Sequence, residues 1–323
     1  MRFHAFEENH GEHRVVVLED RERDSRAVIL PSIGFNLIRC RLEGHETIEG
    51  PPDIPTLASR SSEFGVPLLW PPGRIAGGRF TYQGKAYTYP VHEGLNHLHG
   101  EIRMRPWQVI SLETSEEYAA VIAELRFERT DAEQAYYPHD VVLRMTWRLS
   151  GNRISGALEV INKGDEEVPY AFGLHPYFSF PGKLKDIELS ASVGSQYIAD
   201  ADGIFRRSPM PTDLCEKMRA GLSLDRLPAD CDHFVFRMDG THHYCQIVRQ
   251  EEDIVVHFEF DKGFPYLVVF KPKWANALSL EPWSSISDAY NSPLSSELTG
   301  AVGLKAGERR RMEWAWQVEQ MTR

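Results

Sequence analysis

The sequence predicts an all-β protein, and three observations lead to this fold class. Apolar and polar residues alternate with a period of two in runs that extend from the first residues of the chain to the last. Gly, Pro and Asp separate these runs, as in Asp261-Lys262-Gly263-Phe264-Pro265. Helical periodicity is scarce and strands do not alternate with helices, so we expect an antiparallel sandwich.

The clearest hairpin lies near the middle of the chain. In residues 143–149 the odd positions are apolar and the even ones polar, which indicates a half-buried strand. Ser150-Gly151-Asn152 predicts a turn, and residues 153–162 resume as the partner strand. Further strands are expected at 14–19, 36–43, 107–112, 118–127, 186–190, 254–260, 266–270 and 312–318, and short helices at 55–63 and 211–222.

Length and composition indicate one large folded unit. The chain has 323 residues, enough for two average domains, but β-sandwiches often exceed 200 residues as one. It contains no repeat, low-complexity tract or linker, so we expect a single domain over residues 1–323. The 42% hydrophobic and 11% aromatic content supplies a core. The net charge of −11 argues against a nucleic-acid or anionic-membrane partner.

The cysteines and the first twenty residues indicate the cellular compartment of the protein. Cys40, Cys215, Cys231 and Cys245 are scattered and form no CxxC pair, which excludes a zinc knuckle or a thioredoxin-like motif. The first twenty residues are charged and lack the apolar stretch of a signal peptide. No run approaches the 18 apolar residues of a membrane span. We therefore expect a soluble, reduced, cytoplasmic protein, with monomer and dimer both open.

A histidine and a glutamate, far apart in the sequence, are the strongest candidates for chemistry. Pro176 pushes His175 into an extended conformation at a strand end near Gly173, so its ring is expected to project into a cleft. Glu281 follows apolar residues and precedes Pro282, which we expect to end the strand. Poor solvation beside Trp283 raises a carboxyl pKa and makes a better general base. A strand-end glutamate in a surface ion pair is the alternative.

A second histidine stands in Asn96-His97-Leu98-His99-Gly100. Alternation along an extended segment predicts that His97 and His99 face the same side. Gly100 leaves room for a ligand or a backbone to approach closely. From this run alone, ligand binding and a structural role stay equally open. If the two histidines bound a metal ion, a third ligand would be needed, and no neighbouring residue is clearly placed to supply it.

Two charged residues have local contexts that suit either binding or a plain turn. Arg74 lies in a Pro- and Gly-rich run, residues 71–80, that can aim a guanidinium at hydroxyls or an oxyanion. Asp232 precedes an apolar run and can form charge-assisted hydrogen bonds to hydroxyls. A surface arginine and a turn-capping aspartate are the simpler interpretations from the local sequence.

Taken together, these runs resemble the aldose 1-epimerase, or galactose mutarotase-like, family. The matching runs are residues 73–80, 96–100, 175–178, 232–234 and 281–283, and the resemblance covers the chain from about residue 65 to its end. Pro71 and Pro72 stand where the best-known galactose mutarotases carry a second arginine, and Glu101 follows Gly100 where those proteins usually have glycine. The pattern is similar to a divergent bacterial branch. The resemblance implies a large antiparallel β-supersandwich.

The resemblance also implies an activity, the interconversion of the α and β anomers of a hexose. Glu281 would be the general base on the C1 hydroxyl, His175 the general acid on the ring oxygen, and His99 a further catalytic donor. The implied substrate-binding residues are Arg74, Asp232, Asn96, Trp283 and Tyr177. A hemiacetal must lose a proton at O1 and gain one at O5, so a carboxylate and a histidine suffice and we expect neither metal nor cofactor.

Three alternatives remain beside this interpretation. A hexose-6-phosphate epimerase would need a basic cluster at the cavity rim, for which Arg103, Arg105 and Lys273 are candidates. A non-catalytic sugar-binding or sensor protein would bind without anomerisation. A metal-dependent hydrolase built on His97 and His99 is the least favoured. The aromatic residues Trp70, Tyr177, Phe234 and Trp283 either stack on a sugar or belong to the core.

Overall fold

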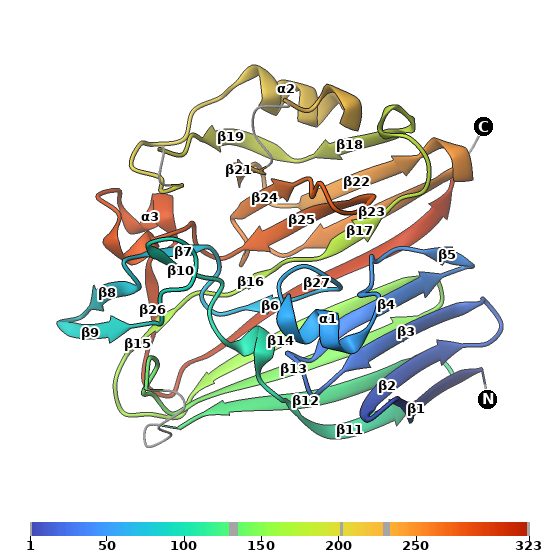
Figure 1. The fold of residues 1–323 in the computed structure, drawn as a ribbon, viewed down its shortest axis with the longest axis horizontal. Helices are drawn as coiled ribbons and strands as arrows, with labels where there is room; N and C mark the ends of the chain where they lie inside the picture. The colour runs from blue at the N-terminus through green and yellow to red at the C-terminus, as the bar shows by residue number, and fades with distance from the viewer. Residues whose placement is uncertain (1, 129–134, 201–202, 229–232, 322–323) are drawn as a thin grey trace.

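Three sheets make up most of the molecule (Figure 1). The computed structural model describes residues 2–128, 135–200, 203–228 and 233–321. The nine-stranded sheet has the order β11 (Gln108–Thr114), β12 (Ala119–Phe127), β13 (Val141–Ser150), β14 (Arg153–Asn162), β27 (Arg309–Gln320), β23 (Ile254–Phe260), β22 (His243–Arg249), β18 (Ile187–Ala191), β20 (Leu222–Ser223).

A seven-stranded and a five-stranded sheet complete the main architecture. The first has the order β19 (Val193–Tyr197), β21 (His233–Met238), β24 (Tyr266–Phe270), β25 (Ala277–Trp283), β16 (Gly173–Leu174), β6 (Leu68–Leu69), and β17 (Tyr177–Ser179) also pairs with β25. The second runs in chain order through β1 (Phe3–His10), β2 (His13–Asp20), β3 (Ser25–Leu30), β4 (Asn36–Leu42) and β5 (His45–Glu46).

The remaining elements are short. Three ribbons pair β7 (Arg74–Ala76) with β10 (Asn96–Leu98), β8 (Arg79–Tyr82) with β9 (Lys85–Thr88), and β15 (Val168–Tyr170) with β26 (Val302–Leu304). The α-helices are α1 (Ile54–Ser59), α2 (Asp213–Ala220) and α3 (Ser296–Thr299), and 3₁₀ turns lie at Ile102–Met104, Leu184–Asp186, Leu224–Arg226, Gln250–Glu252 and Ala289–Asn291. No helix in the described part of the chain is long and apolar enough to cross a membrane.

The all-β prediction is confirmed, and the clearest sequence patterns become central strands. The predicted hairpin is β13 and β14, joined in register from Val141↔Asn162 to Ser150↔Arg153. The two predicted helices are α1 and α2, and Thr212 caps α2 by accepting a hydrogen bond from the backbone N–H of Cys215.

The nine-stranded sheet packs against both smaller sheets. β1 and β2 contact β11, β12 and β13 on one side. On the same face, where Trp147 of β13 and Trp316 of β27 are in contact, Phe178 of β17 lies against Phe258 of β23 and against Trp316, with ring centroids 5.1 and 5.6 Å apart. Alternate residues of β27, among them Trp314 and Trp316, are buried between the layers, as the period-two pattern predicts.

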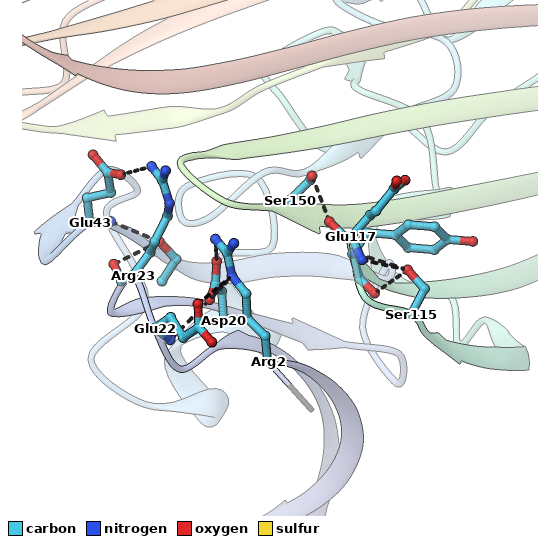
Figure 2. Close-up of polar contacts among 10 residues, drawn as sticks. Arg2, Asp20, Glu22, Arg23, Glu43, Ser115, Glu117 and Ser150 are labelled. Atoms are coloured by element: carbon cyan, nitrogen blue, oxygen red, sulfur yellow. Dashed lines mark hydrogen bonds and ion pairs between the residues drawn. The ribbon is translucent and has the colours of Figure 1, made fainter.

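Polar contacts tie the strand ends of the five-stranded sheet to each other (Figure 2). Arg2 donates to both carboxylate oxygens of buried Asp20, at 2.9 and 2.6 Å. Burial opposes ionisation of Asp20, but these bonds and the Glu22 amide hold its pKa below the ordinary value. At the neighbouring hairpin Ser150 donates to the Glu117 carbonyl.

The backbone beside His99 approaches another segment so closely that only glycine fits. Gly100 has a φ of +63°, and a Cβ there would lie 1.7 Å from the carbonyl oxygen of Trp70. Gly100→Ala is therefore expected to lower the melting temperature strongly, because one of two backbone segments must move. Thermal unfolding followed by circular dichroism measures the loss.

Gly84→Ala is the matched control for this substitution. Gly84 also has a positive φ, +78°, but a Cβ there would meet nothing within 4 Å. This variant keeps only the backbone strain of about 1–2 kcal/mol. Equal losses of stability in the two variants would contradict the role of close approach at Gly100.

Candidate active site

Strand register places the two principal candidate residues opposite each other. β25 pairs with the short strands β16 and β17 through Gly173↔Trp283 and Tyr177↔Ser279. The same antiparallel register puts His175, between β16 and β17, across from Glu281. Cross-strand partners project their side chains to the same face. His175 Nε2 accordingly lies 3.3 Å from Glu281 Oε1.

Alternation along β25 separates the site from the core. Ser279, Glu281 and Trp283 face one side of the seven-stranded sheet, while Leu278 and Leu280 face the other and join the main hydrophobic core. The strand continues through Pro282 to Trp283, so the expectation that Pro282 ends it is wrong. Pairing of Trp283 with both Tyr266 and Gly173 holds the strand beyond the proline.

The side chains on the outward face surround a cavity of about 330 Å³. This volume lies within the range of sites for small molecules. Its polar walls include Arg74, His99, His175, His233, Glu281 and Ser287. Its aromatic walls are Tyr177, Phe205, Phe270, Trp274 and Trp283. The cavity thus combines flat apolar surfaces with a few convergent polar groups.

A serine on the same strand face fixes the tautomer of His175. The Ser279 hydroxyl donates to the Pro176 carbonyl at 3.0 Å, because a carbonyl only accepts. The same oxygen lies 2.9 Å from His175 Nδ1, so it accepts a hydrogen bond from the Nδ1–H. Nε2 is therefore the ring atom that exchanges a proton, and it is the atom that faces Glu281.

His99 is held in the opposite tautomer. Its Nδ1 accepts a hydrogen bond from the backbone N–H of Gly73 at 3.2 Å, which leaves the proton on Nε2. Burial and then the neighbouring His175 lower the pKa of His99 well below its ordinary value. The ring stands edge-on to His175, with centroids 5.2 Å apart. His99 is thus a neutral hydrogen-bond donor at the cavity wall.

The prediction that His97 and His99 face the same side is wrong. The strand β10 ends at Leu98, and His99 has a left-handed backbone with φ of +66°, which breaks the extended alternation. His99 consequently lines the cavity, whereas His97 is fully buried away from it and bonds to the Pro90 carbonyl.

Burial shifts both members of the His175–Glu281 pair toward their neutral forms. Burial raises the pKa of Glu281 well above its ordinary value, and the nearby Ser279 hydroxyl and Trp283 indole lower it by less. Burial lowers the pKa of His175 to about 3. The opposite shifts reverse the ordinary order of the two pKa values, so a proton shared by the pair rests on the Glu281 carboxyl and leaves the His175 imidazole neutral.

Two buried polar atoms in the cavity wall lack a hydrogen-bond partner among the described residues. They are Glu281 Oε2, an acceptor, and Trp283 Nε1, a donor. Burying such atoms unpaired costs free energy, and natural structures retain them mainly where a ligand completes the bonding. The site is therefore suited to a ligand that carries several hydroxyl groups.

Arg74 lines the cavity but is held by an acidic partner. Its Nε and Nη2 form a two-bond ion pair with Glu93, at 3.1 and 2.7 Å. Its backbone N–H donates to Ser287 Oγ. The arginine thus offers a directed donor group with its charge largely compensated.

The structure brings together most of the predicted residues. His175, Glu281, His99, Arg74, Trp283 and Tyr177 all line the cavity. Asn96 does not; its short strand pairs with β7, and its side chain lines an adjacent hollow that shares Arg74. Asp232 lies outside the described residues, although its neighbour His233 lines the cavity. Trp70 packs against Tyr137 and Tyr170 in the core.

Sequence reasoning missed several contributors to the site, among them Ser279, Phe270 and Trp274. Ser279 stands two residues before Glu281, and period-two alternation alone places the two on one face. Phe270 closes the predicted strand 266–270 and faces the cavity. Trp274 is 38% exposed at the cavity rim and carries the guanidinium of Arg60 over its ring. No local pattern marks Trp274 as part of the site.

Comparison with known proteins identifies the family of this chain. The aldose 1-epimerase family model matches residues 15–315. The chain belongs to the aldose 1-epimerase family. The galactose mutarotase-like protein of Clostridium acetobutylicum has the same fold, with a TM-score of 0.91, 21% identity and 99% of both chains covered. Galactose 1-epimerase from Lactobacillus acidophilus superposes with a TM-score of 0.80, 16% identity and 99% of both chains covered.

Two curated relatives come from Escherichia coli K12. The uncharacterized protein YphB is 24% identical over 265 residues, which cover 78% of this chain and 83% of YphB. The uncharacterized protein YihR is 28% identical over 162 residues, 48% of each chain. The family assignment confirms the resemblance that the sequence runs predict, and the matching solved structures confirm the β-supersandwich.

In this member of the aldose 1-epimerase family, Glu281 is expected to reduce stability as the pH rises. A carboxyl whose folded pKa exceeds its unfolded value stabilises the fold below the unfolded pKa, and that contribution is lost as the pH rises through the folded pKa. Glu281→Gln removes the ionisation, so its melting temperature is expected to exceed that of the wild type by a margin that grows from pH 5 to pH 9. Thermal unfolding across this range measures the margin.

Glu124→Gln provides the contrast. Glu124 is also buried on a strand, but bonds from Arg144 and Arg126 outweigh burial and hold its pKa below the ordinary value. This variant is expected to be less stable than the wild type at neutral pH. A Glu281→Gln margin that is constant with pH would contradict the inferred shift.

Proposed function

We propose that the protein is a mutarotase that interconverts the α and β anomers of a free hexose. The observation that carries this proposal is the contact of 3.3 Å between His175 Nε2 and Glu281 Oε1 at the wall of a cavity of small-molecule size. O1 and O5 of a hemiacetal are bonded to the same carbon, so its acid and base must act within a few ångströms of each other.

In the proposed ring opening, Glu281 carboxylate removes the proton from O1 while the C1–O1 double bond forms. The C1–O5 bond breaks, and O5 takes the proton from His175 Nε2. The aldehyde rotates about the C1–C2 bond, and the ring closes on the other face as Glu281 returns a proton to O1 and His175 recovers one from O5. Each proton transfer contributes on the order of 10²–10⁴-fold.

The pair carries one transferable proton throughout this cycle. The proton first passes from Glu281 to His175 Nε2 across the 3.3 Å contact, which gives an imidazolium beside a carboxylate, and ring opening returns the pair to a neutral imidazole beside a carboxylic acid. Burial favours the second state, as the directions of both pKa shifts indicate. Ring opening therefore discharges a buried ion pair, which favours formation of the open-chain intermediate.

The other proposed roles concern the hydroxyls and the faces of the sugar. His99 would donate from Nε2 to the ring oxygen or a neighbouring hydroxyl, since its Nδ1 is held by Gly73. Arg74 and Trp283 would donate to hydroxyls, and Tyr177 would support His175, on which its ring stacks at 4.8 Å. Asp232 stays a proposed hydroxyl ligand, and Asn96 would reach only a substituent in the adjacent hollow.

A neutral hexose is favoured over a hexose 6-phosphate. Among the described residues, Arg74 is the one arginine or lysine that lines the cavity, and Glu93 compensates its charge. Arg103 is buried outside the cavity wall, and neither Arg105 nor Lys273 contributes to that wall. A phosphate would thus lack the cluster of cations that normally binds it.

A single domain and a cytoplasmic location stay predictions.

Anomer exchange measured by NMR tests the proposal. Wild type is expected to accelerate exchange of glucose or galactose, and Glu281→Gln to lose about 10²–10⁴ of that rate because the base is gone. Glu124→Gln, a buried glutamate remote from the cavity, is expected to retain the activity.

The sugar panel in the same assay separates the alternatives. Faster exchange of the 6-phosphates than of the free sugars would replace the neutral substrate with a phosphorylated one. Saturable binding without exchange, in folded wild type, would establish a non-catalytic sugar-binding protein instead.

Ser279 is proposed as a positioning residue that acts through His175. Ser279→Ala removes the acceptor for His175 Nδ1–H, so the imidazole loses its fixed orientation. We expect kcat to fall by about 10-fold with little change in KM, and Ser279→Thr, which keeps the hydroxyl, to restore part of the rate. A rise in KM with unchanged kcat would indicate that Ser279 serves binding alone.

A further inference from the structure

Next to the cavity, three side chains converge without taking part in the proposed reaction. They are His92, His97 and Glu101, and one ligand atom from each lies within 4.8 Å of the other two. His92 is exposed, Glu101 is half-buried and His97 is fully buried. The group joins the two ends of the segment that forms β10.

One backbone carbonyl sets the tautomer of both histidines. His97 Nδ1 lies 2.7 Å from the Pro90 carbonyl oxygen, and His92 Nδ1 lies 3.3 Å from the same atom. A carbonyl only accepts, so both rings donate from Nδ1, and Nε2 is the ring atom that each offers to a ligand. Metal-binding histidines commonly show this arrangement, in which a backbone oxygen orients the ring and increases its basicity.

The buried Nε2 of His97 has no hydrogen-bond partner among the described residues. The nearest acidic oxygen is Glu101 Oε1 at 3.7 Å, beyond hydrogen-bond distance. Because His97 donates from Nδ1 to the Pro90 carbonyl, its Nε2 presents a lone pair toward the Glu101 carboxyl oxygen across this gap. A cation between them would satisfy both atoms.

We propose that His92, His97 and Glu101 bind a divalent transition-metal ion, with Zn²⁺ as the best match. Two imidazole nitrogens and one carboxylate oxygen are a common zinc set, with bonds of about 2.0–2.2 Å and a fourth position open to water. The exposed His92 ring must move inward by about an ångström to reach such bond lengths.

The bound ion would stabilise the active-site wall without entering the reaction. His92 is adjacent to Glu93, which holds Arg74, and Glu101 is two residues from His99. A metal that ties His92 to Glu101 would thus hold two nearby residues in place. These are Glu93, the partner of Arg74, and His99, which lines the cavity. Arg103 lies close enough to Glu101 and His97 to influence the pKa of each, and this cation weakens the site relative to an isolated His₂Glu set.

Metal binding by untagged full-length protein tests the proposal. After treatment with a chelator, the protein is titrated with ZnCl₂ in competition with a chromophoric chelator, and one equivalent is expected to bind. Zn²⁺ is also expected to raise the melting temperature by a few degrees, because it binds only the folded site.

His92→Ala and Glu101→Gln are each expected to weaken binding about 10-fold or more, because each removes one ligand. His92 is exposed, so its removal does not threaten the fold. His242→Ala is the control, since His242 is an exposed histidine that lies near Glu259 outside the group. It is expected to leave affinity unchanged.

Two outcomes would overturn the proposal. One is the absence of stoichiometric binding, and the other is equal affinity in wild type and in both ligand variants, which would place the ion elsewhere. Anomer exchange is measured separately in these proteins, so failure of the metal site leaves the proposed function untouched.

Discussion

The candidate site depends on one constraint, the register of β25 against the two short strands β16 and β17. Because Gly173 pairs with Trp283 and Tyr177 with Ser279, His175 must face Glu281. A slip by one residue would turn Glu281 into the hydrophobic core, where an uncompensated carboxylate costs several kcal/mol. The apolar residues Leu278 and Leu280 on the opposite face fix this register, so core packing aligns His175 with Glu281.

The same arrangement explains why the pair is buried. Central strands are covered on both faces, here by the core on one side and by aromatic cavity walls on the other. Burial is unfavourable for the ionised pair, and it shifts the pKa values of imidazole and carboxyl in opposite directions, toward the neutral form of each. Ser279 adds orientation with a single hydroxyl that accepts from His175 and donates to Pro176.

Most of the fold was predictable because alternation is strong where one strand face is buried. β13, β14 and β27 follow it closely. β22 was not predicted, since its inward positions include His243 and Arg249, whose polarity hides the pattern although both are buried. The turn at His99 was also unpredictable, because its left-handed backbone comes from a close approach between distant segments that no local sequence records.

For the site, the sequence singled out candidate residues that the fold brings to one cavity, but not the contacts between them. Glu281 and His175 stood out through their neighbours, whereas the Arg74–Glu93 ion pair joins strand β7 to the segment before β10, a contact that no local pattern predicts. Local patterns report burial and turns, while charge compensation depends on tertiary distance. For this reason the sequence alone left a 6-phosphorylated sugar open as the substrate. The compensation of the Arg74 charge by Glu93, which argues against a phosphate, is visible only in the structure.

The division of β25 into two faces has a consequence for how such a protein diversifies. Odd-numbered positions face the ligand and even-numbered ones face the core, so a substitution on one face leaves the packing of the other nearly unchanged. On the neighbouring strand β24, Val268 and Phe270 line the cavity while Leu267 and Val269 face the core, so the cavity-wall positions there can likewise vary without refilling the interior. A family built on this sheet can change its preferred ligand through single substitutions, each of which costs little folding stability.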